Sequence, residues 1–102
     1  MRDILAKTTE RIGKELSGSP AIEAHLRGVL GVAYHAITDF DAAETQWTRA
    51  LELYRAERGE VDMDVAQQYS NLGLLAEARS DYAGAEKQLQ KAVEIARRAG
   101  PE

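Results

Sequence analysis

Residues 24–59 read AHLRGVLGVAYHAITDFDAAETQWTRALELYRAERG, and the same pattern returns 42 positions further along the chain. The shift places identical residues on one another at many positions, among them Leu30/Leu72, Gly31/Gly73, Ala36/Ala78, Asp39/Asp81, Ala43/Ala85, Glu44/Glu86, Ala50/Ala92 and Glu52/Glu94. An internal repeat of this length is the signature of a stacked array of helical units. Because such arrays present extended surfaces to other molecules, the pattern favours binding as the activity.

Composition agrees with a small binding domain. The chain has 102 residues, enough for one domain with a modest core. Its 13 basic and 17 acidic residues give a net charge of -4, which disfavours nucleic-acid binding by bulk attraction. There is no cysteine, so neither a disulfide framework nor a thiolate site is available, and we expect a cytoplasmic protein. No apolar run is long enough for a signal peptide or a membrane span, so no membrane association is expected.

Apolar residues spaced three and four apart, with capping residues between them, predict an all-α protein of five antiparallel helices. Ser19, Asp39 and Asp81 are the expected N-caps, and glycines at 18, 59 and 100 with Pro101 are the expected stops. The expected helices are residues 2–17, 20–38, 40–58, 65–79 and 82–99. The organisation is half a unit (1–18) followed by two units (19–59 and 60–102).

The small and large residues of the first unit carry a family resemblance. Leu30-Gly31, Tyr34, Ala43, Trp47 and Ala50 resemble the signature of a tetratricopeptide repeat, and the second unit echoes it at 72–92. The resemblance covers residues 20–100 and implies a right-handed solenoid of stacked helix pairs. The 42-residue period is similar to the long repeats of kinesin light chains and to repeat segments of bacterial serine/threonine kinases. The chain departs from that pattern at Arg55 and Arg97, where a proline is common, and at 61–63, where a His-Pro often stands.

The two mid-helix glycines indicate close helix packing. Gly31 and Gly73 each cost about 1 kcal/mol relative to alanine in a helix, so something must require the missing side chain. We expect the small residues Ala43 and Ala50 of the partner helix to allow this close approach, with Trp47 between them filling the space beside Tyr34 as a core residue rather than a ligand anchor. The expected core is centred on Leu30, Tyr34, Trp47, Leu72 and Leu89. The buried face of the second helix is expected to contain Ile22, Leu26, Val29, Leu30, Ala33 and Ile37.

In a stacked array the first helix of each pair lines the concave side. The resemblance implies that a peptide of a partner protein binds there, with Asn71 offering an amide donor and acceptor to the ligand backbone. Gly28 and Val32 stand where some family members clamp a C-terminal carboxylate, so such a ligand is disfavoured. The candidate groove residues are His25, Val32, His35, Gln67, Ser70, Asn71, Leu74 and Glu77.

No motif predicts catalysis, a cofactor or a metal site. His25 and His35 are ten residues apart, about 80° around a helix, without an acidic partner at matching spacing. The acidic run at 60–64 lacks the glycine and terminal glutamate of a calcium loop and reads better as a linker with a helix N-cap. The function expected is therefore a non-catalytic protein-interaction module of a larger signalling or scaffold protein.

Self-association through a structural groove is the alternative. Leu51, Leu53 and Tyr54 are expected to pack on the fourth helix, whereas their counterparts 42 residues later have no following unit. An open apolar strip favours a two-fold homodimer. The residues expected in this strip are Leu89, Val93, Ile95 and Ala96.

Overall fold

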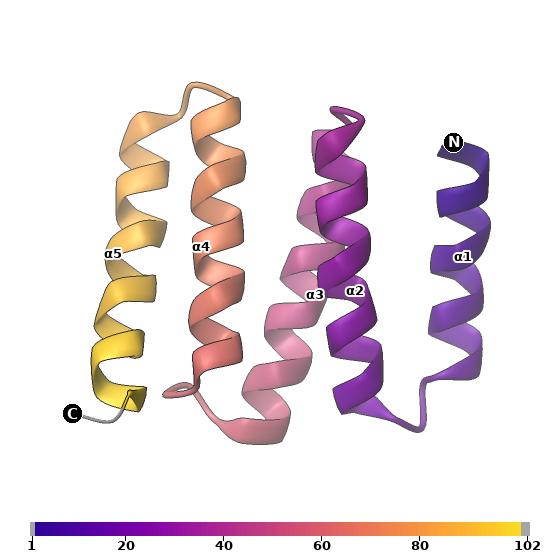
Figure 1. Cartoon of the computed structure of the whole chain (residues 1–102), viewed down its shortest axis with the longest axis horizontal. Coiled ribbons are helices and arrows are strands. Elements are labelled where there is room, and N and C mark those ends of the chain that lie inside the picture. Colours follow the sequence, from indigo (N-terminus) through magenta and orange to yellow (C-terminus); the bar gives the residue numbers. More distant parts are fainter. Residues whose placement is uncertain (1, 101–102) are drawn as a thin grey trace.

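The computed structural model describes residues 2–100, and all of its regular structure is helical (Figure 1). The helices are α1 (Arg2–Glu15), α2 (Pro20–Ala36), α3 (Phe40–Arg58), α4 (Met63–Ala78) and α5 (Tyr82–Ala99). The five expected helices and the all-α class are thereby confirmed, with ends that shift by one to two residues. Pro101, expected to help end the last helix, lies outside the described residues.

The helices form antiparallel pairs that stand beside one another in sequence order (Figure 1). α2 packs mainly on α3 and α4 on α5, while α3 joins the two pairs by packing on α4, and α1 packs on α2. The result is a slab of 40 × 34 × 16 Å, about two helices thick. Each first helix of a pair, α2 and α4, therefore shares one side of the slab with its counterpart.

Three aspartates begin helices by accepting hydrogen bonds from backbone N–H groups that have no intrahelical partner. Asp39 accepts from the Ala42 N–H and Asp81 from the Gly84 N–H, as their positions in the repeat predict. Asp62 accepts from the N–H groups of residues 64 and 65, so α4 begins two residues earlier than expected. Ser19 occupies the N-cap position of α2, but its side chain makes no capping hydrogen bond.

The first helix of each pair ends through the same turn. Thr38 and Ser80, which are 42 residues apart, have φ angles of 60° and 63°, in the left-handed region. The next N–H, from Asp39 or Asp81, donates back to the carbonyl five residues earlier, at 2.9 Å and 2.8 Å. α2 therefore ends at Ala36 instead of continuing to Thr38, because a left-handed residue cannot extend a right-handed helix.

The core consists of two clusters that meet at the half-buried Leu72. The cluster nearer α1 contains the expected Leu30, Tyr34 and Trp47, and Trp47 is only 1% exposed. The buried members of the other cluster are Ala24, Ala50, Leu51, Tyr54, Val65, Ala66 and Ile95.

Three expected core residues lie outside the core. Leu89 is 43% exposed, because no helix in the described chain covers it as α4 covers its counterpart Trp47. Ile22 and Val29 are 54% and 53% exposed, so the expectation that they belong to the buried face of α2 was wrong. Their side of α2 faces away from both α1 and α3, whereas Leu26 and Leu30 pack toward those helices.

The mid-helix glycines are explained by close packing. A Cβ atom at Gly31 would lie 2.6 Å from Cε2 of Trp47, and one at Gly73 would lie 2.8 Å from Cγ of Leu89. Both distances are far inside normal van der Waals contact. Trp47 is also held by its indole N–H, which donates to the Gly28 carbonyl at 3.1 Å. The close helix packing predicted from the two glycines is confirmed, and the side chains that fill the space at Gly31 and Gly73 are those of Trp47 and Leu89.

A buried polar network ties α2 to α3. The Glu23 side chain is 5% exposed and accepts a hydrogen bond from Nε of Arg27 at 2.7 Å. Arg27 also donates to Oε1 of Gln46 on α3 at 2.8 Å. A buried carboxylate is tolerated only when it is paired and hydrogen-bonded, so this network fixes how the two helices pack.

Candidate peptide-binding groove

A shallow groove of about 310 Å³ runs between α2 and α4, on the side of the slab that these two helices share. Its walls come from both units of the repeat. The lining residues are His25, Gly28, Val29, Val32, Tyr54, Asp64, Gln67, Gln68 and Asn71.

One wall of the groove is apolar and faces solvent. Val29 and Val32 of α2 are 53% and 57% exposed. Leu74, the repeat counterpart of Val32 on α4, is 47% exposed but does not line the groove. Gly28 has no side chain, and a Cβ there would meet only Gln68, at 3.8 Å, so the floor between the walls stays open. Exposed aliphatic side chains such as those of Val29 and Val32 form a surface that would bury apolar side chains of a ligand.

The opposite wall holds a chain of amides along α4. Gln67 donates to Oδ1 of Asn71 at 3.2 Å, and Nδ2 of Asn71 donates to Oε1 of Gln68 at 3.3 Å. Gln68 is buried and anchored in turn to the Asp64 carbonyl. An amide has two N–H donors and two acceptor lone pairs, so Asn71 keeps one of each for a further partner. The network therefore orients Asn71 with a free donor and a free acceptor beside the apolar wall.

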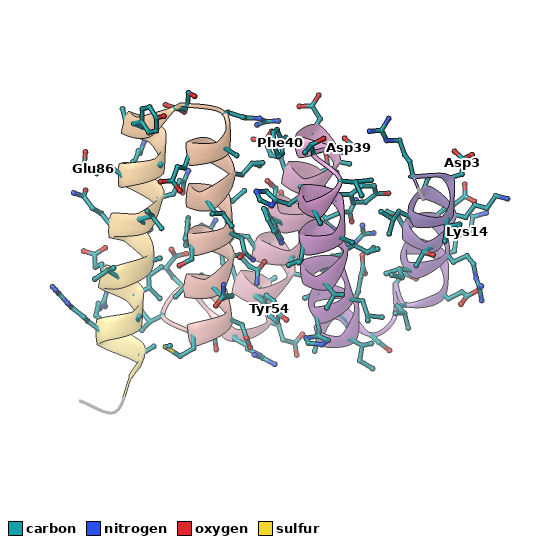
Figure 2. The ribbon with its side chains drawn as sticks, turned by 45° about the horizontal axis from the view of Figure 1, so that its top comes forward. Asp3, Lys14, Asp39, Phe40, Tyr54 and Glu86 are labelled. Carbon is teal, nitrogen blue, oxygen red and sulfur yellow. The ribbon has the colours of Figure 1, made fainter. Side chains whose placement is uncertain are left out.

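The lower end of the groove, near the α3–α4 connection, carries Tyr54 and an acidic group. Burial raises the pKa of Tyr54, and the nearby Asp64 carboxylate raises it further. Arg58 lies over the Tyr54 ring, 5.2 Å from its centroid, and pairs with Asp64. Figure 2 shows Tyr54 at the opposite end of α3 from Phe40. Because its pKa is raised, the Tyr54 phenol stays neutral at physiological pH and offers a polar edge without a charge.

The structure brings four of the eight predicted groove residues into this one groove, namely His25, Val32, Gln67 and Asn71. Leu74 is exposed but is not among the residues that line the groove. Ser70 lines a separate hollow between α4 and α5. Glu77 of α4 lines another hollow, which lies along the outer face of α5. The predicted set is therefore distributed over three neighbouring surfaces.

His35 lies at the edge of the core. Its ring centroid is 5.5 Å from that of Phe40 and 5.8 Å from that of Trp47. Its Nε2 atom is buried and has no hydrogen-bond partner. His35 does not line the groove, and these contacts place it among packing residues.

Four lining residues were not anticipated, namely Val29, Tyr54, Asp64 and Gln68. Val29 was assigned to the core, because its spacing fits the apolar face of α2, yet it forms part of the groove wall. Gln68 gave no signal beyond its polarity, although it holds Asn71 in place. The 42-residue shift could have identified Val29, since its counterpart is the groove residue Asn71.

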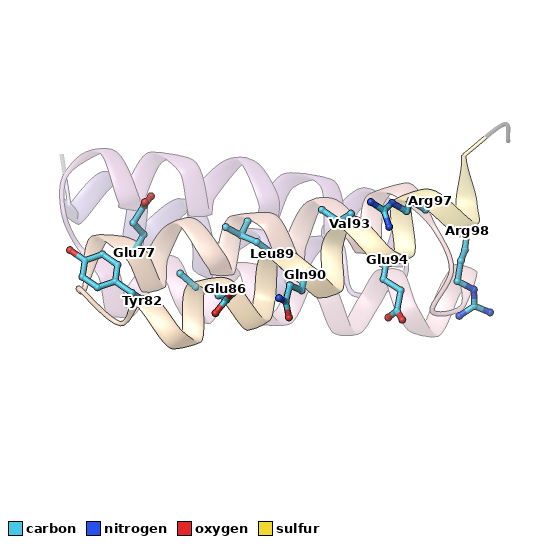
Figure 3. Close-up of a pocket in the computed structure, with 10 residues that line it drawn as sticks. Glu77, Tyr82, Glu86, Leu89, Gln90, Val93, Glu94, Arg97 and Arg98 are labelled. Carbon is cyan, nitrogen blue, oxygen red and sulfur yellow. The ribbon is translucent and has the colours of Figure 1, made fainter.

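A second exposed surface lies along α5. Tyr82, Leu89 and Val93 are 67%, 43% and 49% exposed and line a broad hollow with Arg97 and Glu77 (Figure 3). Ile95, expected in this strip, is 2% exposed. It packs on α4 within its own helix pair, so its assignment to the open surface was wrong, and Ala96 is half-buried beside the same cluster.

These features define a stacked helical-repeat protein with an open groove along the first helix of each pair. A family model described as tetratricopeptide repeat matches residues 21–98. The chain belongs to the tetratricopeptide repeat family, whose members generally mediate protein–protein interaction and are typically not catalysts. The searches of curated proteins and of solved structures gave no significant match.

Two further observations concern the described residues. No helix within 2–100 combines the length and apolarity needed to cross a membrane. Over the same range, histidine and acidic side chains nowhere gather in groups of three that could hold a metal ion.

Proposed function

We propose that this chain binds an extended peptide segment of a partner protein in the groove between α2 and α4. The observation that carries the proposal is the pairing of an exposed aliphatic wall, Val29 and Val32, with the oriented amide of Asn71 across it. An extended peptide presents backbone N–H and C=O groups together with side chains, so it matches both walls at once.

The charge of the groove favours an uncharged or weakly basic ligand. Its lining contains one acidic residue, Asp64, and His25, but neither Lys nor Arg. A ligand that relied on a terminal carboxylate would lack a cationic partner there. The net charge of -4 likewise favours a protein over a nucleic acid as the partner.

Selection of random peptides displayed on phage tests this proposal, with each enriched peptide then titrated by calorimetry. The change Val32→Asp places an unpaired charge on the apolar wall and should weaken binding at least about tenfold. Asn71→Ala removes up to two hydrogen bonds and should weaken binding about 3-fold to 30-fold. The matched control is Glu57→Ala, an exposed residue of α3 outside the groove.

The groove is the binding site if both groove variants weaken binding while Glu57→Ala does not. Circular dichroism must show the same helix content for all variants. If the enriched peptides bind the Val32→Asp variant as tightly as the parent, the ligand lies elsewhere and the proposal is wrong.

A further inference from the structure

The repeat itself shows what kind of element covers the exposed strip of α5, which contains Tyr82, Glu86, Leu89, Val93 and Arg97. In the first unit, Trp47 and Leu51 of α3 are 1% and 7% exposed, because α4 lies over them. Their counterparts on α5 are Leu89 and Val93, at 43% and 49% exposed. The same face is thus buried by a helix in one unit and open in the other.

The covering helix in the first unit makes two contacts that matter here. Leu75 of α4 packs in the cluster of Trp47, and Arg79, four residues later, donates to Oε1 of Glu44 at 2.9 Å. α3 and α4 run in opposite directions, so the later residue of α4 meets the earlier residue of α3 (Figure 1). In the first unit, this face is therefore covered by an antiparallel helix in which an aliphatic residue is followed four positions later by an arginine.

α5 carries that same pattern on its own exposed side. Val93 is followed four positions later by Arg97, and both line the hollow. Glu86, the counterpart of Glu44, lines it as well. Eleven residues make close to three helical turns, so Glu86 and Arg97 lie on the same side of α5. Figure 3 shows Leu89 and Val93 between the Tyr82 end and the arginine end of the helix.

We propose that a second copy of this chain covers the strip, with the two α5 helices packed antiparallel about a two-fold axis level with Lys91. This register places Leu89 of one copy opposite Val93 of the other, where Leu75 lies opposite Trp47 within the chain. It also brings Arg97 of one copy close to Glu86 of the other. Arg97 is then within one residue, about 1.5 Å along the helix axis, of the position directly opposite Glu86. The pairs Leu89–Val93 and Glu86–Arg97 between the copies have the same register as α4 on α3. Because of the two-fold symmetry, each pair occurs twice in the dimer.

The charges of the strip support this orientation. Glu77 and Glu86 lie toward one end of the hollow and Arg97 and Arg98 toward the other, so only an antiparallel arrangement brings opposite charges together. Glu94 lies about 80° around the helix from Glu86, at the rim of the face. The inference does not depend on the groove between α2 and α4, since none of the residues in the two proposed pairs lines it.

Sedimentation equilibrium of the parent chain and of charge-reversal variants tests the proposal. The parent should show a reversible monomer–dimer equilibrium at micromolar concentration. Glu86→Arg and Arg97→Glu each turn two attractive pairs into repulsive ones and should weaken the dimer about tenfold. An equimolar mixture of these two variants should dimerise as tightly as the parent, because both pairs in the mixed dimer again join opposite charges.

Lys87→Glu is the matched control, since it changes a charge of α5 at an exposed position outside the hollow. It should leave the dimer unchanged, whereas Val93→Glu should abolish it. Circular dichroism verifies that all variants keep the helix content of the parent. A parent that stays monomeric, or a mixture no tighter than its two components, overturns the proposal.

Discussion

Two glycines three residues apart on α2 should respond to alanine in opposite directions. Gly28→Ala adds a methyl group whose nearest neighbour is the Gln68 side chain at 3.8 Å, an ordinary contact. The variant therefore gains the helix propensity of alanine and should be more stable by up to about 1 kcal/mol. Gly31→Ala adds the same methyl group 2.6 Å from Cε2 of Trp47.

The Gly31 contact falls about 1 Å short of normal carbon–carbon separation. Trp47 cannot easily move away, because it is 1% exposed and its indole N–H donates to the Gly28 carbonyl. Overpacking of a filled core costs about 1–3 kcal/mol, and this shortfall belongs at the upper end of that range. The higher helix propensity of alanine offsets about 1 kcal/mol of this cost, so Gly31→Ala should lower the free energy of unfolding by about 2 kcal/mol.

Urea unfolding measures both variants, followed by circular dichroism and by the fluorescence of Trp47, the single tryptophan. The midpoint should rise for Gly28→Ala and fall for Gly31→Ala, with the same dependence on denaturant. In a Trp47→Leu background, Gly31→Ala should cost less, and this coupling in a double-mutant cycle isolates the contact. A Gly31→Ala protein as stable as the parent would refute the packing argument.

Three other predictions concern stability. Trp47→Ala should lower the free energy of unfolding by about 3–5 kcal/mol, read from thermal melting, because the cavity lies in the core. Arg27→Ala should cost about 3 kcal/mol by leaving the buried Glu23 with only the more distant Arg49 at 4.0 Å, whereas Glu23→Leu with Arg27→Met should cost less in the same urea assay. Burial and the Asp64 carboxylate raise the pKa of Tyr54 above its ordinary 10.0, so its contribution to stability is complete below that pH. The contribution is lost as pH rises above 10.0 through the folded-state pKa, so over that interval the parent should lose more stability than Tyr54→Phe.

The sequence predicted the helices because several boundaries have a local chemical cause. Asp39 and Asp81 cap helices through their own side chains, and the repeat marks both positions. The sequence did not reveal that the first helix ends before Thr38, because a left-handed threonine is uncommon and no local pattern announces it. The existence of each helix therefore followed from local signals, whereas the ends of α2 and α4 depended on the turn that joins each helix to its partner.

The burial of individual faces was harder to predict. α2 has two apolar stripes, and only contact with α1 and α3 determines that Leu30 is buried while Val29 is exposed. On α5, Val93 and Ile95 are equally hydrophobic, but they point in nearly opposite directions, about 200° apart. Glu23 gave no signal at all, because charged residues are rarely buried unless paired. Tertiary packing therefore decided which residues form the groove.

The groove and the α5 strip are not separate surfaces. Gln67 lines both the groove and the hollow between α4 and α5, and Val93 lines both that hollow and the strip. A second copy docked on α5 would cover Val93. Its surface would then form a new wall at the far side of the hollow between α4 and α5, which adjoins the groove at Gln67. A peptide long enough to pass Gln67 would touch this wall, so its affinity would differ between monomer and dimer. Thermodynamic linkage then requires the peptide to change the dimerisation constant by the same factor. Sedimentation with and without saturating peptide gives the factor for dimerisation, and peptide titration of the dimeric parent compared with the monomeric Val93→Glu variant gives the factor for peptide affinity. A factor of one in both experiments would show that the two occupants do not meet.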